Sequence, residues 1–399
     1  MQQSDRTATA AAALVLVVGM GFGRFAFTGL YPLMVSEQQI SVQGGSYAAS
    51  ANYAGYLIGA LLAALLSGIP SRKLCSFSVI ATVIALGLFA FSLPEWLVVA
   101  IRGFAGLFSA ISMVAASHWL IHDRRQHAGA PALYSGVGIG ILVSAEMIAL
   151  GHLASWSSGQ IWLGLAIAAL VLTIIAIVMQ TAADRARPHE TPVGHPSEKD
   201  KAQPLLGATR LIIIYGLAGL GYIITATYLP LLVRSALASV DPVHIWAVFG
   251  LGAVPSCFLW HFLHERWGTH RSLMINLIVQ AIGVALPVLH TPASYIASAL
   301  LVGATFMGTV TIAMPAARRV ATKVRFNMLA IMTASYGVGQ IVGPLMANAL
   351  FARTGSFDSS LEIAGLALLV AGVLCVSRTR TPNDKYCDGS PSGKGNTAA

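Results

Sequence analysis

Long apolar runs separated by short polar connections repeat along the whole chain. Six runs of spanning length lie at about 8–35, 46–68, 74–93, 96–120, 131–152 and 160–183. Six more lie at about 208–234, 242–264, 272–290, 293–317, 326–350 and 359–377. Because a helix crosses the roughly 30 Å hydrocarbon layer with about 20 residues, this pattern predicts twelve transmembrane helices.

Two polar segments interrupt the pattern. Residues 184–207 are rich in charge and proline, and residues 378–399 are polar. Neither segment has enough apolar side chains to pack or to enter lipid. We therefore predict an all-α integral membrane protein with one six-helix bundle at 1–183 and a second at 208–377. The segment 184–207 is expected to be a cytoplasmic linker, and 378–399 a disordered cytoplasmic tail.

The composition excludes a water-soluble globule. Of the 399 residues, 56% are hydrophobic and 10% are charged, whereas an ordinary soluble domain is about 25% charged. Even a domain of about 300 residues buries only about three-quarters of the surface that its unfolded chain exposes. The outer surface of this chain must therefore face lipid.

The net charge of +9 comes from basic side chains in loops. These side chains do not form the basic stripe that is typical of a nucleic-acid-binding protein. Almost all Lys and Arg residues lie in loops on the side of the N-terminus or in the tail. Arg234 and Arg353 lie on the opposite side. Since positively charged loops stay in the cytoplasm, we expect a multi-pass protein of the bacterial inner membrane with both termini cytoplasmic.

The two halves of the sequence resemble each other. Glycine and proline positions recur at nearly one offset, about half the chain: Gly21, Gly23 and Pro32 recur as Gly219, Gly221 and Pro230, and the Gly-Val-Gly at 136–138 recurs at 337–339. This regularity is typical of a duplicated unit. Because six spans is an even number, the two bundles are expected to be related by a pseudo-twofold axis along the membrane normal.

The arrangement of six plus six spans around a charged loop resembles the major facilitator superfamily of secondary transporters. Residues 265–271, Glu-Arg-Trp-Gly-Thr-His-Arg, resemble its acidic-Arg-x-Gly-x-x-basic signature, and the loop after the second span keeps only the basic pair. Residues 21–25, 50–56 and 336–344 resemble the uncharacterised YbfB/YjiJ-type branch. The resemblance implies transport, and it implies gating or structural roles for Arg72, Lys73, Glu265, Arg266, Gly268 and Arg271.

Three charged residues are predicted to lie deep inside spans: Arg24, Arg102 and Glu146. A charge at a helix centre costs about 2.5 to 3.5 kcal/mol on insertion scales, so such residues usually face the bundle interior and mark function. Opposite charges about 4 Å apart attract by about 4 kcal/mol at an effective dielectric near 20. We therefore hypothesise that Glu146 pairs with Arg24 or Arg102.

In this hypothesis Glu146 and Arg102 couple transport to protons, and Arg24 binds an anionic group of the substrate. A static ion pair is the alternative for Glu146, and a purely structural role is the alternative for Arg102. Polar residues in other spans could also line the cavity, or could instead bond a neighbouring helix; these are Asn52, Tyr53, Tyr222, Thr225, Tyr228, Thr305 and Gln340.

The sequence thus predicts a secondary active transporter that moves a small organic solute, with a weak preference for an anionic or zwitterionic one, together with protons. An efflux antiporter for amphiphilic compounds and a non-transporting receptor or scaffold are the alternatives. The expected partners are the solute, protons and membrane lipid, without nucleic acid, and family analogy suggests a monomer. The spans contain no pair of a nucleophile and a base that would predict an enzyme. The histidines do not form a set of three or four ligands, so we expect no metal site and no other cofactor.

Overall fold

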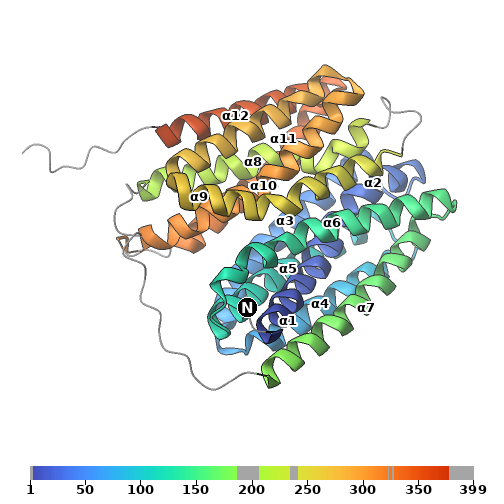
Figure 1. Cartoon of the computed structure of the whole chain (residues 1–399). Coiled ribbons are helices and arrows are strands. Elements are labelled where there is room, and N and C mark those ends of the chain that lie inside the picture. Colours follow the sequence, from blue (N-terminus) through green and yellow to red (C-terminus); the bar gives the residue numbers. More distant parts are fainter. Residues whose placement is uncertain (1–2, 187–205, 234–240, 322, 326–327, 377–399) are drawn as a thin grey trace, which may run out of the picture.

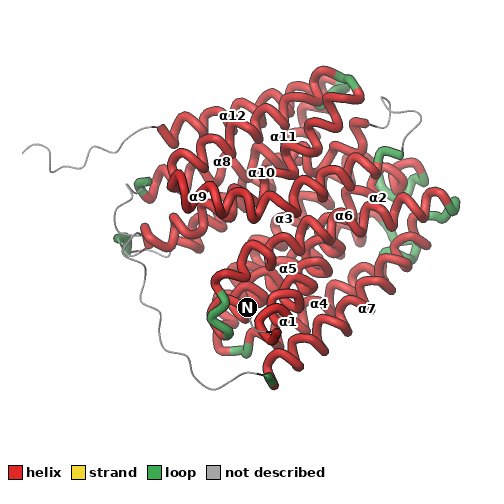
Figure 2. The backbone as a smooth tube through the Cα atoms, viewed as in Figure 1, coloured by secondary structure: helices red, strands yellow, loops and turns green. Residues whose placement is uncertain are grey.

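The computed structural model describes residues 3–186, 206–233, 241–321, 323–325 and 328–376. Within these ranges the chain is all-helical, and Figure 2 shows that loops and turns are confined to the helix ends. Most of the predicted linker and all of the predicted tail lie outside the described residues. Among the described residues, 10 helices are long and apolar enough to cross a membrane.

The first half of the chain, residues 3–186, begins with a continuous helical segment made of three parts. These are α1 (Gln3–Leu16), the π-helix η1 (Val17–Phe25) and α2 (Ala26–Ser36). The longer helices that follow are α3 (Val42–Leu65), α4 (Ser71–Leu88), α5 (Glu95–Ser117), α6 (Ala130–Leu153) and α7 (Ser158–Arg185), with a short π-helix, η3 (His118–Asp123), after α5. Serines define two of the starts, because Ser41 caps α3 and Ser157 forms a capping box with Gln160 at α7.

The second half, residues 206–376, contains five long helices. They are α8 (Ala208–Val233), α9 (Val243–Ala285), α10 (Pro292–Ala321), α11 (Met328–Thr354) and α12 (Asp358–Val376), with a short 3₁₀ turn, η6 (Leu286–Leu289), after α9. The first apolar run predicted from the sequence covers α1, η1 and α2 together, two runs correspond to the two parts of α9, and each of the others coincides with one helix.

Helix α9 is two helices joined at Gly268. That residue has φ 77° and ψ 174°, a backbone conformation that glycine adopts without steric cost. The Ser272 hydroxyl donates to the Leu263 carbonyl at 3.0 Å, although nine residues of straight helix would span about 13.5 Å. The chain therefore turns back on itself at Gly268.

The helices of the two halves form two groups that meet along a seam. Figure 1 shows α1 to α7 gathered on one side and α8 to α12 on the other. Across the seam, α3 packs against α11, α6 against α9, and α2 against α8. Backbones come very close there, since a Cβ on Gly138 of α6 would lie 2.7 Å from the backbone nitrogen of Val254 in α9.

The outside of the molecule carries large apolar side chains. Examples are Leu65, Leu153 and Leu366, with 79%, 80% and 61% of their surface exposed. A water-soluble monomer rarely exposes a continuous apolar surface of this size. Lipid contact explains it.

Candidate functional site: a cavity between the two halves

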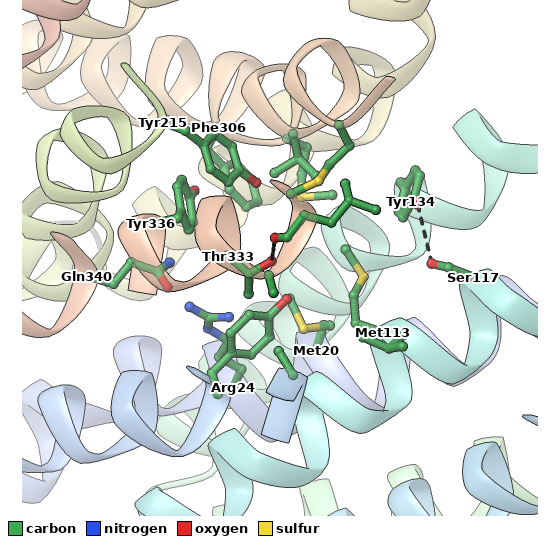
Figure 3. Close-up of a pocket in the computed structure, with 18 of the residues that line it drawn as sticks. Met20, Arg24, Met113, Ser117, Tyr134, Tyr215, Phe306, Thr333, Tyr336 and Gln340 are labelled. Carbon is green, nitrogen blue, oxygen red and sulfur yellow. Dashed lines mark hydrogen bonds between the residues drawn. The ribbon is translucent and has the colours of Figure 1, made fainter. Parts of the chain in front are cut away.

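A cavity of about 420 Å³ lies on the seam, lined by residues of both halves. Its deep end is formed by buried residues such as Arg24, Phe306 and Gln340. Its other end is lined by the exposed residues His118, His122 and Arg318, so the cavity opens there. We call this the open end. Figure 3 shows the Arg24 guanidinium on one side of the space, facing Thr333, Tyr336 and Gln340 on the other.

The π-helix η1 positions Arg24. Alternating glycines let this segment pack against its neighbours, and a Cβ on Gly21 would clash with the Cα of Gly140 in α6. π-helical turns are rare overall, but many of those known lie at functional sites. The extra residue in such a turn redirects the side chains that follow it. Here the turn ends on Arg24 and Phe25, both of which line the cavity.

Arg24 is buried and lies among aromatic rings. Only 3% of its surface is exposed, and the centre of the guanidinium lies 4.0 Å from the ring centroid of Tyr56, 5.1 Å from that of Tyr53 and 5.3 Å from that of Phe25. The Nε and Nη2 atoms have no hydrogen-bond partner among the described residues. Cation–π contacts stabilise the charge, but these N–H donors have no acceptor in the part of the chain that the structure describes.

Arg102 of α5 supports Arg24 from behind. It donates hydrogen bonds to the carbonyl oxygens of Gly23 and Arg24, at 3.1 and 3.0 Å, and its guanidinium lies 4.4 Å from the Phe27 ring centroid. The Asn52 side chain in turn donates to the Arg102 carbonyl at 2.9 Å. Arg102 and Asn52 do not line the cavity; they hold the π-helical turn that carries Arg24.

The second half contributes a row of nearly parallel rings. The ring planes of Tyr222 and Tyr336 are tilted by 21°, with centroids 5.9 Å apart, and Tyr222 and Phe306 are tilted by 21° at 5.7 Å. Tyr215 stacks on Tyr336 at 4.4 Å. Gln340 donates to the Tyr222 hydroxyl, and this bond fixes the amide at the deep end of the cavity.

The predicted pairing of Glu146 with Arg24 or Arg102 is wrong. Glu146 lies beyond the cavity along α6, and its Oε1 is 3.2 Å from Nδ1 of His244 at the start of α9. Its side chain is 48% exposed. The apolar run predicted the approximate depth of Glu146 along α6 but not the direction in which its side chain points, and α6 turns this face toward α9.

The other predicted cavity residues divide into two groups. Tyr222 and Gln340 line the cavity, as Arg24 does. The other five do not line it and are buried. Asn52 donates a hydrogen bond to the Arg102 carbonyl, and the hydroxyls of Tyr53 and Tyr228 form hydrogen bonds with the opposite half. Thr305 donates a hydrogen bond to the Leu301 carbonyl, and Thr225 is fully buried. Sequence reasoning missed Tyr56, Phe306 and Tyr336, because aromatic residues inside apolar runs look like ordinary core residues.

The predicted gating residues lie on the side of the open end, in the first turn of α4 and around the turn at Gly268 within α9. Arg72 pairs with Asp184 at 3.7 Å and Glu265 with His261 at 3.3 Å, while Lys73, Arg266 and Arg271 are exposed. Gly268 makes the turn between the two parts of α9.

The seam is closed on the other side of Arg24. Hydrogen bonds between the halves join Thr28 Oγ1 to the Ala226 carbonyl at 3.1 Å, the Tyr53 hydroxyl to Thr227 Oγ1 at 3.1 Å, the Tyr228 hydroxyl to Ser46 Oγ at 2.7 Å, Ser50 Oγ to the Ile341 carbonyl at 3.2 Å and Trp246 Nε1 to the Phe25 carbonyl at 3.0 Å. We call this region the closed end.

Two histidine–carboxylate pairs also cross the closed end. Besides Glu146 with His244, the His152 side chain of α6 bonds Asp241, which lies just before α9; both of these side chains are 22% exposed. Burial tends to raise the pKa of Asp241, but hydrogen bonds from His152 and from the Val243 backbone N–H outweigh it, so the pKa of Asp241 lies below its ordinary value.

A helical protein with an apolar outer surface and a cavity that opens at only one end of the seam between its halves has the form of a membrane transporter. Residues 16–376 match the family described as "Uncharacterised MFS-type transporter YbfB". The chain therefore belongs to this family of the major facilitator superfamily. It is a multi-pass membrane transporter and not an enzyme, as the sequence predicted.

Solved structures agree with this fold. The chain is similar to the crystal structure of an Asp-to-Ala mutant of the nucleoside transporter NupG, with a TM-score of 0.68, 13% identity and coverage of 92% of this chain and 98% of that chain. A second NupG crystal structure has a TM-score of 0.64, 14% identity and coverage of 94% and 98%. A comparison with curated protein sequences found no match. At these identities the likeness concerns the fold alone.

Proposed function

We propose that this protein is a secondary active transporter that moves a small organic solute by alternating access, with a preference for an anionic or zwitterionic solute. The observation that carries the proposal is Arg24: a buried guanidinium with two unpartnered nitrogens at the deep end of a cavity that is open on one side and closed on the other. Binding energy in such a site can favour one state of the seam over the other.

The proposal includes twelve spans. The 10 candidate helices include one of 47 residues, Val243–Leu289, which is far longer than the about 20 residues that a crossing needs and turns back at Gly268. Counting its two parts separately and adding α3 (Val42–Leu65) brings the number of spans to twelve. We assign six spans to a bundle at 1–183 and six to a bundle at 208–377. The two bundles are related by a pseudo-twofold axis and are joined by the linker 184–207.

Orientation follows from the loop charges. With the basic loops and the tail at 378–399 in the cytoplasm, both termini are cytoplasmic and the open end faces the cytoplasm. The described conformation is then the inward-facing one. We place the protein in the bacterial inner membrane as a monomer.

Proton coupling is also part of the proposal. The histidine–carboxylate pairs of the closed end, His152 with Asp241 and His244 with Glu146, join the two halves. The strength of a histidine–carboxylate contact depends on the protonation of both partners, so protons can change these contacts. Protons would then act on the equilibrium between the states of the seam, while Arg24 binds the solute.

Efflux of small amphiphilic compounds is the second candidate. The lining supports it, because Met20, Met113, Met307 and Met314 all contact the cavity, and flexible methionine side chains adapt to differently shaped apolar ligands. The direction of transport distinguishes this candidate from uptake.

Vesicles containing the purified protein test the proposal. They are incubated with a mixture of organic acids, zwitterions, nucleosides and amphiphilic amines, with and without a pH gradient, and the solutes that enter or leave are identified by mass spectrometry. We expect protein-dependent flux that falls by at least about tenfold in Arg24→Gln, since a hydrogen bond to a charged group is lost. Arg353→Gln is the matched control, because Arg353 is exposed at the end of α11.

Two results would contradict the proposal. Absence of protein-dependent flux for every solute would remove the transport function and would favour a receptor or scaffold. Undiminished flux in Arg24→Gln would remove Arg24 from the binding site.

A further inference from the structure

The charge balance of the cavity is uneven. Arg24 lies at its deep end, and none of the described residues that line the cavity is Asp or Glu. Glu146, the acidic residue predicted to balance Arg24, lies instead at the closed end. A buried cation without an anionic partner is unfavourable in a membrane interior, so the missing negative charge is expected to come from the ligand.

The open end of the cavity is also basic. Arg318 lines the approach and is exposed. Like charges along the walls of a cleft raise the local concentration of an oppositely charged solute. An anion would therefore meet positive charge first at the open end and then at Arg24.

Rings dominate the walls between these charges. Tyr56 lies under the Arg24 guanidinium, and the row formed by Tyr215, Tyr336, Tyr222 and Phe306 lies on the opposite half with neighbouring ring planes tilted by no more than 26°. Parallel rings of this kind gain an additional offset-stacked interaction with another aromatic ring, which a saturated ring does not make. The walls therefore favour a planar solute.

One acceptor at the deep end has no partner. Gln340 uses its Nε2 to bond Tyr222, while its Oε1 has no hydrogen-bond partner among the described residues. A solute N–H or O–H could donate to it. The cavity volume of about 420 Å³ is at the low end of the roughly 300 to 1,000 Å³ of small-molecule sites, which suits a solute with one or two rings.

We propose that the solute is a planar aromatic or heteroaromatic monoanion, with its carboxylate on Arg24, its ring against the Tyr222 and Phe306 rings, and a hydrogen-bond donor toward Gln340. This inference rests on the proposed transport function and adds the chemical class of the solute.

Four probes separate charge from planarity, and their binding to the purified full-length protein at pH 7.5 is measured by the shift in unfolding temperature across a concentration series. Benzoate has both features, benzamide lacks the charge, cyclohexanecarboxylate lacks the planar ring, and 4-hydroxybenzoate adds a donor. We expect benzoate to bind at least about tenfold more tightly than benzamide and about fivefold more tightly than cyclohexanecarboxylate. We expect 4-hydroxybenzoate to bind at least as tightly as benzoate.

Two variants should remove these preferences separately. Arg24→Gln should abolish the preference for benzoate over benzamide and keep the preference for the planar ring, and Arg24→Lys should keep part of the charge preference. Phe306→Leu should abolish the preference over cyclohexanecarboxylate and keep that over benzamide. Phe104→Leu is its control, because Phe104 is 60% exposed on α5 outside the cavity. The unfolding temperature without probe shows whether each variant folds.

Equal binding of benzamide, or equal binding of cyclohexanecarboxylate, overturns the proposed class. So does the absence of binding by all four probes when the vesicle assay shows Arg24-dependent flux of other solutes, and in that case the transport function stands. Absence of both binding and flux overturns the class and the transport function together.

Discussion

The two ends of the seam are built from the same helices but from different chemistry. α3 contributes Ser46 and Ser50 to the closed end and Tyr56 to the cavity, and α8 contributes Tyr228 to the closed end and Tyr222 to the cavity. Hydroxyls and carbonyls pair across the closed end, whereas rings and an unpartnered guanidinium line the cavity. The change occurs within about two helical turns, at the depth of Arg24.

This difference indicates what alternating access requires. A hydrogen bond contributes only about 0.5 to 1.5 kcal/mol net, so a closed end made of separate hydrogen bonds can open when solvent replaces the partners. The cavity needs no bonds between the halves, because its wall groups bind the solute.

Arg102 lies where the two ends meet, and its replacement should have the largest effect. Arg102→Met leaves the buried carbonyls of Gly23 and Arg24 without their donor, which costs about 1 to 3 kcal/mol for each unsatisfied group. We expect a lower unfolding temperature together with loss of solute flux, because Arg24 is no longer held in place.

Arg353→Met controls for the loss of an arginine. If Arg102→Met kept the wild-type unfolding temperature and lost only the proton-driven part of the flux, Arg102 would act in proton coupling and not as support for Arg24.

Gly138 tests the contact between α6 and α9 at the middle of the seam. In Gly138→Ala the new Cβ lies 2.7 Å from the Val254 nitrogen and 2.9 Å from atoms of Ala253, and overpacking of this kind costs about 1 to 3 kcal/mol. We expect slower flux and a lower unfolding temperature, since the two helices can no longer approach.

Gly87→Ala, in α4, is the control for Gly138→Ala, because its Cβ would meet no atom within 4 Å. It should leave flux unchanged and raise helix stability slightly. Equal effects of the two substitutions would show that close approach at Gly138 has no special importance.

The sequence predicted the helices well. In lipid, the backbone N–H and C=O groups of each apolar run must form hydrogen bonds within that run, and a helix does this. The sequence also placed Arg24, Tyr222 and Gln340 in the cavity. For Arg24 the reason is physical, since a charge inside a span has few favourable places other than an interior cavity.

The remaining features of the site depend on contacts that no linear pattern encodes. Whether Glu146 faces Arg24 or His244 depends on the rotation of α6 about its axis and on how closely α9 approaches it. In the first helical segment, the π-helix at Val17–Phe25 changes the direction of the side chains locally. Its alternating glycines indicate close packing but not an extra residue in the turn. Tyr56 and Phe306 resemble core residues until the two halves are placed side by side.

Asp241→Asn tests the contribution of this carboxylate to the closed end. Because the pKa of Asp241 is lowered, the stability that its carboxylate contributes is present above its ordinary pKa of 3.8 and is lost only as the pH falls through the lower folded-state value. We expect the closed end of the wild type to keep this contribution at pH 7, and Asp241→Asn to loosen the closed end there, because the amide no longer supplies the carboxylate that contacts His152 and the Val243 backbone N–H.

Spin labels at Ala154→Cys and Ser356→Cys, in a background without the native cysteines, report the separation of the halves at the closed end. Longer distances in Asp241→Asn than in the wild type at pH 7 are the expected result. Equal distances in the two proteins would exclude the Asp241 contacts as a source of closure.

Glu146→Gln should have the smallest effect. The Glu146 and His244 side chains are 48% and 43% exposed, whereas His152 and Asp241 are each 22% exposed, and exposed ion pairs contribute only about 0 to 1 kcal/mol. We expect solute flux driven by a pH gradient to stay within about twofold of the wild-type value, in line with that small energy. Loss of gradient-driven uptake in Glu146→Gln, with solute exchange preserved, would instead make Glu146 a proton carrier. The two histidine pairs would then differ in function, and exposure would be a poor guide to which of them matters.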